Sequence, residues 1–278
     1  MSQVRDDNAS RAQPATPRRR GRVPAALLIP AGLGLLFLVL PLAGLVIRAP
    51  WATLPGRLTE PGALTALRLS VQTATLATVL CLLLGVPLAW VLARVEFPGR
   101  RLVRALVTVP LVLPPVVGGV ALLLVFGRRG LLGGWLDATF GITLPFTTAG
   151  VVLAESFVAM PFLVIAVEGA LRAADHRYEE AAATLGASRW VTFTHVTLPL
   201  VAPGLAAGAV LCWARALGEF GATITFAGNY PGRTQTMPLA VYLALETDLE
   251  SAIVLSLVLL VVSVGILVAL RDRWMTGA

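Results

Sequence analysis

The residues of this chain that could carry chemistry are carboxylates and arginines in unusual settings. Glu179 and Glu180 are adjacent in a polar stretch, and Arg215 is followed four residues later by Glu219 within a long apolar run. Adjacent carboxylates can act as acid and base, and an arginine in an apolar segment can attract an anion or pair with a nearby acid. The role that applies depends on the elements that carry these residues.

Most enzyme classes lack their required residues in this sequence. All 22 basic residues are arginine, so the chain has neither a Walker A lysine nor a Schiff-base lysine. Cys81 and Cys212 lie in apolar runs without a CxxC spacing, and His176 and His195 have no HExxH context. The sequence therefore indicates no metal site, no disulfide framework and no membrane enzyme, and any ATPase must be another subunit.

The composition is that of an integral membrane protein. Apolar residues make up 57% of the 278 residues, charged residues only 13%, and the mean hydropathy is +0.82. Soluble domains have about 45–50% apolar and about 25% charged residues. The net charge of +7 comes from arginine, which in membrane proteins sets topology, so we expect no nucleic acid partner.

Six stretches are long and apolar enough to cross a bilayer, which takes about 20 residues in a helix. They are 24–47, 69–93, 105–126, 149–171, 200–226 and 251–270. We therefore predict an all-α integral membrane fold with six transmembrane helices. The first helix, 24–48 with its flanking residue, is too long for a signal-peptide core and is expected to be retained. The arginine-rich tail before it, 1–23, has no periodicity and is predicted to be disordered.

The arginines outside these stretches predict the orientation of the chain. With six spans both termini lie on one side, and the arginines of the tail and of the loops 94–104 and 172–189 all fall on that side. They far outnumber those on the other side, which include Arg128 and Arg233. The positive-inside rule then predicts that both termini, and the loop that contains Glu179 and Glu180, are cytoplasmic.

The loop between the fourth and fifth spans is predicted to form a short helix. Asp175 can cap its start, and Gly186 can supply the positive φ that ends many helices. Ser188 can cap a second short helix that ends near 198–200. One face of the first helix is apolar or small: it consists of Tyr178, Ala181, Ala182 and Leu185.

Such a helix permits two interpretations. It can lie on the lipid surface with Trp190 and Phe193 as anchors, or it can present its small residues to a groove on another protein. The physical pattern alone favours the first.

The spacing in this loop favours the second interpretation. Glu180-Ala181-Ala182, three residues, Gly186, nine residues, then Val196-x-Leu198-Pro199 resembles the EAA loop of ABC importer permeases, with valine in place of isoleucine. The resemblance implies that 172–198 is a coupling loop that binds a separate ATPase subunit. Glu179 and Glu180 are then not an acid/base pair. The ATPase-coupling residues it implies are Glu180, Ala181, Ala182, Gly186, Leu198 and Pro199.

The carboxylates and the arginine within the spans also have alternative roles. Arg215 and Glu219 can neutralise one another across one helical turn, or Arg215 can attract an anion along a pathway. Glu155 and Glu168 stand near the two ends of the fourth span, where they can snorkel or cap. In an ion-coupled carrier they would instead be candidate proton relays.

A second resemblance concerns the cargo. The run RALGEFGATITFAGN-x-PGRTQTMPLAVY, which begins at Arg215, and LPPVVGG at 113–119 resemble the molybdate ABC transporter permease family, over residues 64–270. This implies the type I ABC importer permease fold in the cytoplasmic membrane of a bacterium, in contact with lipid. The implied partners are a second copy of the permease, two ATP-binding subunits that hold the ATP and Mg, and an extracytoplasmic molybdate-binding protein. No cofactor is expected in this chain.

The pathway and gate are expected in the third and fifth spans, where glycines and prolines such as Pro115, Gly119 and Gly218 permit kinks and close helix contacts. The residues that we select as candidates are Arg215, Glu219, Gly221, Pro114 and Gly118. A permease for sulfate/thiosulfate or tungstate remains an alternative because these oxyanions share charge and shape. An ion-coupled secondary anion carrier is an alternative of a different class.

Overall fold

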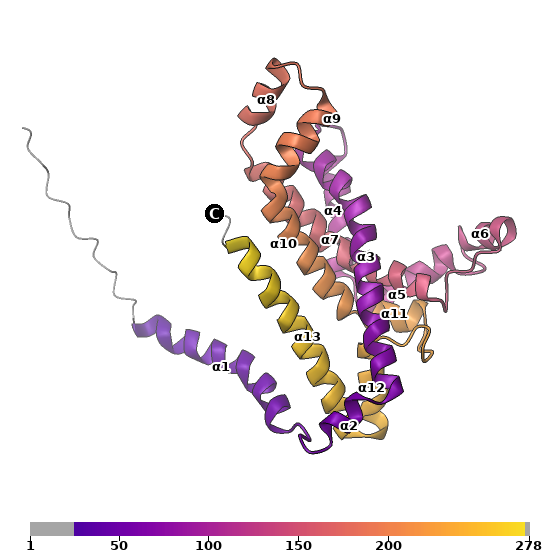
Figure 1. Ribbon diagram of the computed structural model, residues 1–278. Coiled ribbons are helices and arrows are strands. Elements are labelled where there is room, and N and C mark those ends of the chain that lie inside the picture. Colours follow the sequence, from indigo (N-terminus) through magenta and orange to yellow (C-terminus); the bar gives the residue numbers. More distant parts are fainter. Residues whose placement is uncertain (1–24, 276–278) are drawn as a thin grey trace, which may run out of the picture. The chain divides into compact units, whose positions relative to one another are not determined.

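The structure, a computed structural model, describes residues 25–275, and every regular element in this part of the chain is helical (Figure 1). The predicted disordered tail, 1–23, lies outside the described residues. The chain divides into two units, residues 1–44 and 45–278. The helices are α1 Ala25–Ile47, α2 Leu54–Leu58, α3 Pro61–Arg94, α4 Arg100–Val112, α5 Pro115–Phe126, α6 Gly133–Phe140, α7 Thr148–Ala173, α8 Arg177–Thr184, α9 Arg189–Thr192, the π-helix η1 Phe193–Thr197, α10 Leu198–Leu217, α11 Gly221–Phe226, α12 Met237–Thr247 and α13 Leu249–Met275.

The number of membrane-spanning helices agrees with the prediction. Five helices in the described residues are long and apolar enough to cross a membrane, and the bent pair α4–α5 makes a sixth if it counts as one span. The first, fourth and sixth predicted spans match α1, α7 and α13 to within a few residues. α3 begins at Pro61, earlier than predicted, because a proline is favoured in the first turn of a helix.

The third predicted span, 105–126, is not one straight helix. α4 ends at Val112, α5 begins at Pro115, and the two axes are bent by 118°. Leu113 has ψ of 130°, the extended conformation that a following proline imposes, and Pro114 and Pro115 cannot donate the backbone hydrogen bonds of a continuing helix. The pair of prolines is thus the physical reason for the break.

The fifth predicted span, 200–226, differs from the prediction at both ends. α9, η1 and α10 form one continuous apolar helix, Arg189–Leu217, so the second short helix expected after Ser188 is not a separate element. At the other end α10 stops at Leu217, Gly218 follows it, and the chain resumes as the short α11. Residues that were expected in one span therefore lie in two helices.

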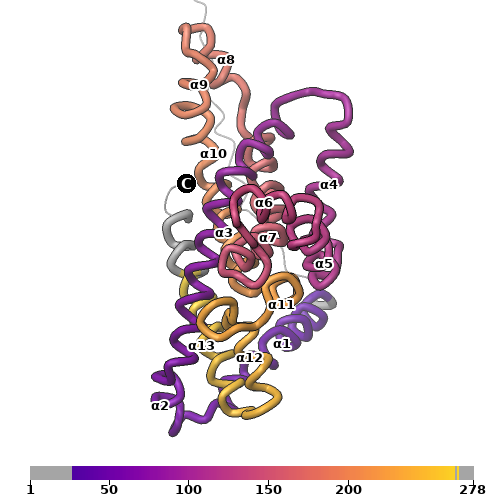
Figure 2. Tube along the Cα trace, turned by 90° about the vertical axis from the view of Figure 1, so that its right-hand side faces the viewer, coloured from indigo at the N-terminus to yellow at the C-terminus, as the bar shows by residue number. Residues whose placement is uncertain are grey.

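The core of the second unit is formed by α3, α7 and α10, which pack along much of their lengths (Figure 2). Gly204 and Gly208, four residues apart on α10, face α7 closely. A Cβ added to Gly204 would collide with Cβ of Ala170, and one added to Gly208 would lie 2.9 Å from Cβ of Ala166. Small residues at this spacing let two helix backbones approach, which is how helices associate inside membranes.

A second, smaller cluster joins α5 and α11 to α7. Its buried residues include Leu122, Ala154, Ala222 and Phe226. Gly119 of α5 lies against α11, and an added Cβ would be 2.7 Å from Cβ of Thr225 and 2.9 Å from the carbonyl oxygen of Ala222. The two short helices are therefore in backbone contact.

The ends of the second unit are formed by different elements. α8 and α9 lie at one end, and α2 and α12 lie at the opposite end, in both views (Figures 1 and 2). α7 has 26 residues, which corresponds to about 39 Å and exceeds the roughly 30 Å apolar core of a bilayer. The two ends of α7 thus reach opposite surfaces of a membrane.

Candidate functional site

The loop helix α8 begins and ends as its residues predict. Oδ1 of Asp175 accepts a hydrogen bond from the backbone N–H of Arg177 at 3.0 Å. Gly186 has φ of 81° and follows the last turn, and the N–H of Ala187 donates to the carbonyl of Ala182 at 3.0 Å, which closes the helix end. The hydroxyl of Ser188 accepts from the N–H of Val191 at 3.3 Å and caps α9.

The apolar face of α8 has no partner within the described residues. Tyr178 is 59% exposed and Leu185 is 88% exposed, and Trp190 at the start of α9 is 72% exposed. Among the predicted coupling residues, Glu180 and Ala181 are exposed and Ala182 is half-buried. Large apolar side chains at this exposure, on the end of a membrane bundle, mark a surface suited to contact with another protein or with lipid headgroups.

Glu179, for which the sequence predicts no role, anchors α8 to the bundle. Its Oε1 accepts hydrogen bonds from the guanidinium of Arg94 at 3.0 Å and from the hydroxyl of Thr197 at 2.9 Å. Its Oε2 lies 3.9 Å from Nδ1 of His176. One carboxylate therefore ties α8 to the end of α3 and to η1, while the adjacent Glu180 is exposed to solvent.

The last two predicted coupling residues continue this link. Leu198 and Pro199 open α10 directly after η1, inside the continuous helix Arg189–Leu217, and the N–H of Leu198 donates to the carbonyl of Phe193, five residues back. Because Pro199 has no N–H, it cannot donate the next helical hydrogen bond. Phe193 of η1 packs between Trp190 and Trp90, with ring centroids 6.0 Å and 6.3 Å apart. The structure thus brings the coupling residues to one end of the bundle.

The predicted pair Arg215 and Glu219 is present at the C-terminal end of α10. Nη2 of Arg215 lies 2.6 Å from Oε2 of Glu219, whose side chain is 1% exposed. The other oxygen of Glu219 accepts from the N–H of Ala222 at 2.8 Å, in the first turn of α11. Glu219 therefore neutralises the arginine and also fixes the turn between α10 and α11.

The remaining pathway candidates lie where α5 meets α11. An added Cβ on Gly221 would be 2.8 Å from Cβ of Pro115, and one on Gly118 would be 3.1 Å from the ring of Phe157 on α7. Pro114 stands at the break before α5. The pathway candidates are thus gathered around the α5–α11 contact, far along α10 from the coupling residues.

The expectation that Glu155 and Glu168 snorkel or cap is wrong. Both are buried, with exposures of 1% and 6%. Glu168 accepts from Arg104 at 2.7 Å and lies 2.8 Å from Arg172. Oε1 of Glu155 accepts from the hydroxyl of Thr73 at 2.9 Å, and its Oε2 has no hydrogen-bond partner in the described part of the chain.

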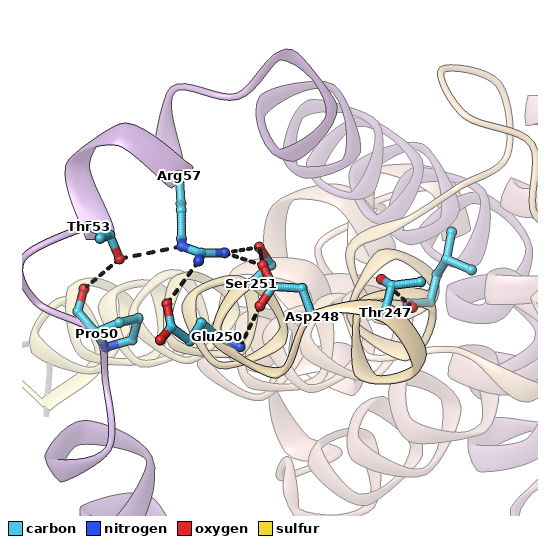
Figure 3. A network of polar contacts seen from close by, with 8 residues as sticks. Pro50, Thr53, Arg57, Thr247, Asp248, Glu250 and Ser251 are labelled. Atoms are coloured by element: carbon cyan, nitrogen blue, oxygen red, sulfur yellow. Dashed lines mark hydrogen bonds and ion pairs between the residues drawn. The ribbon is translucent and has the colours of Figure 1, made fainter.

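A polar network that the sequence did not reveal holds the opposite end of the bundle (Figure 3). Arg57 of α2 reaches across to Asp248, Glu250 and Ser251 at the start of α13, and its distance to Glu250 is 2.8 Å. The guanidinium of Arg57 lowers the pKa of Asp248 from 3.8 to about 2, because it donates a hydrogen bond to the carboxylate. Residues this far apart in the sequence carry no spacing signal for the contact.

Comparisons with known proteins agree with this geometry. Residues 85–276 match the family described as "Binding-protein-dependent transport system inner membrane component". The chain is 50% identical over 255 residues to the "Molybdenum transport system permease protein ModB" of Mycobacterium tuberculosis (strain ATCC 25618 / H37Rv), covering 92% of this chain and 96% of that one.

A more distant relative is named for the transport of sulfate instead of molybdenum. The chain is 37% identical over 258 residues to the "Sulfate transport system permease protein CysT" of Escherichia coli (strain K12), covering 90% of this chain and 93% of that one. Among solved structures, a bacterial ABC transporter involved in the import of the acidic polysaccharide alginate matches with a TM-score of 0.74 at 18% identity, over 90% of this chain and 94% of that one. The latter likeness shows the fold, which is that of ABC importer permeases.

Proposed function

The chain belongs to the family of binding-protein-dependent transport system inner membrane components, and we propose that it is the permease subunit of an ATP-driven importer that carries molybdate into the cell. The observation that carries the proposal is the exposed helix α8, which is anchored by Glu179 and otherwise unpartnered within the described residues, in a chain 50% identical to a molybdenum permease.

ATP hydrolysis then takes place on separate subunits. Two copies of an ATPase, which hold the ATP and Mg, bind α8 of two permease copies, and closure of the ATPase pair moves the helices connected to α8. The small side chains of Ala181 and Ala182 permit a close approach, and Glu180 offers a charge to a basic partner. An extracytoplasmic binding protein delivers the oxyanion at the opposite end.

The orientation that fits this scheme places α8, and with it both termini, on the cytoplasmic side of a bacterial cytoplasmic membrane. The excess of arginine on the α8 side supports it. The surface that carries Arg128 and Arg233 is then extracytoplasmic, where it can meet the binding protein.

Molybdate is favoured over sulfate by similarity. The chain is 50% identical to a molybdenum permease and 37% identical to a sulfate permease over comparable lengths. A sulfate/thiosulfate or tungstate permease is the second candidate, because tetrahedral dianions differ little in charge and shape and the binding protein does much of the selection.

The decisive experiment reconstitutes the permease with its ATPase and binding protein in vesicles and measures ATP-dependent uptake of radiolabelled molybdate, with sulfate as competitor. Glu180→Arg is expected to abolish uptake and co-purification of the ATPase. Glu246→Arg, an exposed acid on α12 at the opposite end, is the matched control and is expected to keep both.

Two results would contradict the proposal. Uptake that persists without an ATPase would indicate an ion-coupled secondary carrier instead. Sulfate that displaces molybdate at equal concentration would shift the assignment to a sulfate permease.

A further inference from the structure

A hollow of about 420 Å³ lies where the end of α5, the segment before α7 and the loop between α11 and α12 meet. Arg128 and Arg233 line it together with Thr143 and Thr147. We propose that this hollow, the outer anion pocket, binds a tetrahedral oxyanion between its release from the binding protein and its passage through the helices. The inference rests on the proposed function, which supplies the orientation and the class of substrate.

The charges of the outer anion pocket are uncompensated. No acidic residue lines it, and within residues 25–275 neither Arg128 nor Arg233 forms an ion pair. Both side chains are exposed. Arg57, Arg94 and Arg215, in contrast, each face a carboxylate. Guanidinium groups with free donors bind oxyanions through charge-assisted hydrogen bonds, often in pairs.

The backbone around Arg128 is held in a tight turn. The N–H of Gly127 donates to the carbonyl of Leu123 at 2.8 Å, and the N–H of Gly130 donates to the carbonyl of Gly127, also at 2.8 Å. A Cβ on Gly133 would collide with the carbonyl oxygen of Gly127, so that only glycine fits there. The turn therefore fixes the origin of the Arg128 side chain.

Arg233 is fixed from the other side of the pocket. Its N–H donates to the carbonyl of Tyr230 at 3.1 Å, and its own carbonyl accepts from the hydroxyl of Thr148 at 2.8 Å. The second bond ties the loop to the first turn of α7. Two segments that are distant in sequence thus hold two arginines at one hollow.

The remaining wall adds positive potential and one hydroxyl donor. The hydroxyl of Thr147 is satisfied within the protein, since it donates to the carbonyl of Leu144 at 2.6 Å and accepts from the N–H of Gly150 at 3.1 Å as the cap of α7. The first turn of this 26-residue helix contributes the positive potential. No side-chain hydrogen bond is formed by Thr143 among the described residues, so its hydroxyl is free to donate. Phe146 has φ of 60°, a conformation that costs energy for a residue other than glycine and is common at functional sites.

The position of the pocket and the exposure of its arginines favour brief binding of an anion on its way through the protein over tight binding. α7 runs for about 39 Å from this pocket to the end that carries α8. Exposed arginines at a hollow of about 420 Å³ concentrate a dianion at the outer surface. Because these arginines remain hydrated, they hold the dianion weakly enough for it to leave, as conduction requires.

The test uses the reconstituted complex with Arg128→Gln, Arg233→Gln and the double variant. Arg129→Gln is the matched control, because Arg129 is the exposed neighbour of Arg128 but does not line the pocket. The double variant is expected to lower molybdate uptake by about tenfold or more, the effect of losing charge-assisted hydrogen bonds. Stimulation of the ATPase by the loaded binding protein is expected to stay unchanged, and Arg129→Gln to behave as the native chain.

A second measurement probes binding without transport. Phenylglyoxal modification of Arg128 and Arg233, followed by mass spectrometry in the absence of the binding protein, is expected to slow several-fold in molybdate relative to chloride at equal ionic strength, and at Arg129 to be unaffected.

The outcomes separate the two levels of inference. If the native complex imports molybdate and the double variant imports it equally well, the outer anion pocket is wrong and the proposed function stands. If the native complex imports no molybdate, the proposed function fails. The outer anion pocket is then judged only by whether molybdate slows the phenylglyoxal modification of Arg128 and Arg233. If molybdate gives no protection and the variants lose ATPase stimulation, the arginines contact carboxylates of the binding protein and the inference is overturned.

Discussion

Oε1 of Glu179 accepts a hydrogen bond from the guanidinium of Arg94 at 3.0 Å, and this contact joins α8 to the end of α3. The side chain of Arg94 is 6% exposed and that of Glu179 is 21% exposed, so the pair is largely removed from water. Thr197 donates to the same carboxylate oxygen. α8 is therefore held by the bundle through Glu179, whose neighbour Glu180 is left exposed.

Glu179→Gln is expected to uncouple the permease from its ATPase. The amide leaves the buried charge of Arg94 uncompensated, which costs about 1–3 kcal/mol of stability and loosens α8. ATP-dependent uptake and thermal unfolding in detergent check this. Arg94→Gln combined with Glu179→Gln is expected to be more stable than either single variant, and a double variant as unstable as the sum of both would contradict the pairing.

Arg215→Met is expected to destabilise the protein because it leaves the carboxylate of Glu219 buried without its partner. Adding Glu219→Gln should recover much of the loss, since the amide oxygen can still accept from the N–H of Ala222. Adding Glu219→Ala should not, because that hydrogen bond is then lost as well. Thermal unfolding of the three variants measures the difference, and equal recovery by both additions would count against the role of Glu219 in the turn.

Gly119→Ala is expected to impair both stability and uptake. The added methyl would lie 2.7 Å from Cβ of Thr225 and 2.9 Å from a backbone oxygen of α11, so the α5–α11 contact must open, at a cost of about 1–3 kcal/mol. Gly169→Ala on α7, where nothing lies within 4 Å, is the control and should be neutral or slightly stabilising. Unfolding temperatures that match for the two variants would disprove the close contact.

The Arg57–Asp248 contact predicts a response to acid. The folded-state pKa of Asp248 is lowered from 3.8 to about 2, so its contribution to stability is complete above pH of about 4 and is lost as the pH falls toward 2. Asp248→Asn should remove this part of the pH dependence, as followed by hydrogen exchange of α2. Glu246→Gln, an exposed acid on α12 without an ion pair among the described residues, should leave the profile unchanged.

The sequence predicted what depends on local pattern. Hydropathy located the spans, because a helix of membrane length that is apolar on all faces is stable in a bilayer and rarely in water. Asp175, Gly186 and Ser188 marked helix ends that the structure confirms. The pair Arg215 and Glu219 was also predictable from its spacing of four residues, although Glu219 lies just past the end of α10 and not on the helix itself.

The sequence did not predict what depends on contacts between distant segments. The arginines Arg94, Arg104 and Arg57, which pair with Glu179, Glu168 and Asp248, come from other helices, and no spacing rule connects them to these acids. A hydropathy profile does not show the 118° bend at Pro114, because the sequence stays apolar across the break. The assignment of coupling and pathway residues stays a prediction.

The continuous helix Arg189–Leu217 has a mechanical consequence. Its 29 residues correspond to about 43 Å, and it runs without interruption from the exposed Trp190 to the break at Gly218. A tilt of about 10° of a helix of this length displaces one end by about 7 Å relative to the other. The helix has two points at which it can bend, the π-helical turn Phe193–Thr197 and Pro203. Because Glu219 fixes the turn after α10, a tilt that passes these two points also moves the start of α11 and its contact with α5.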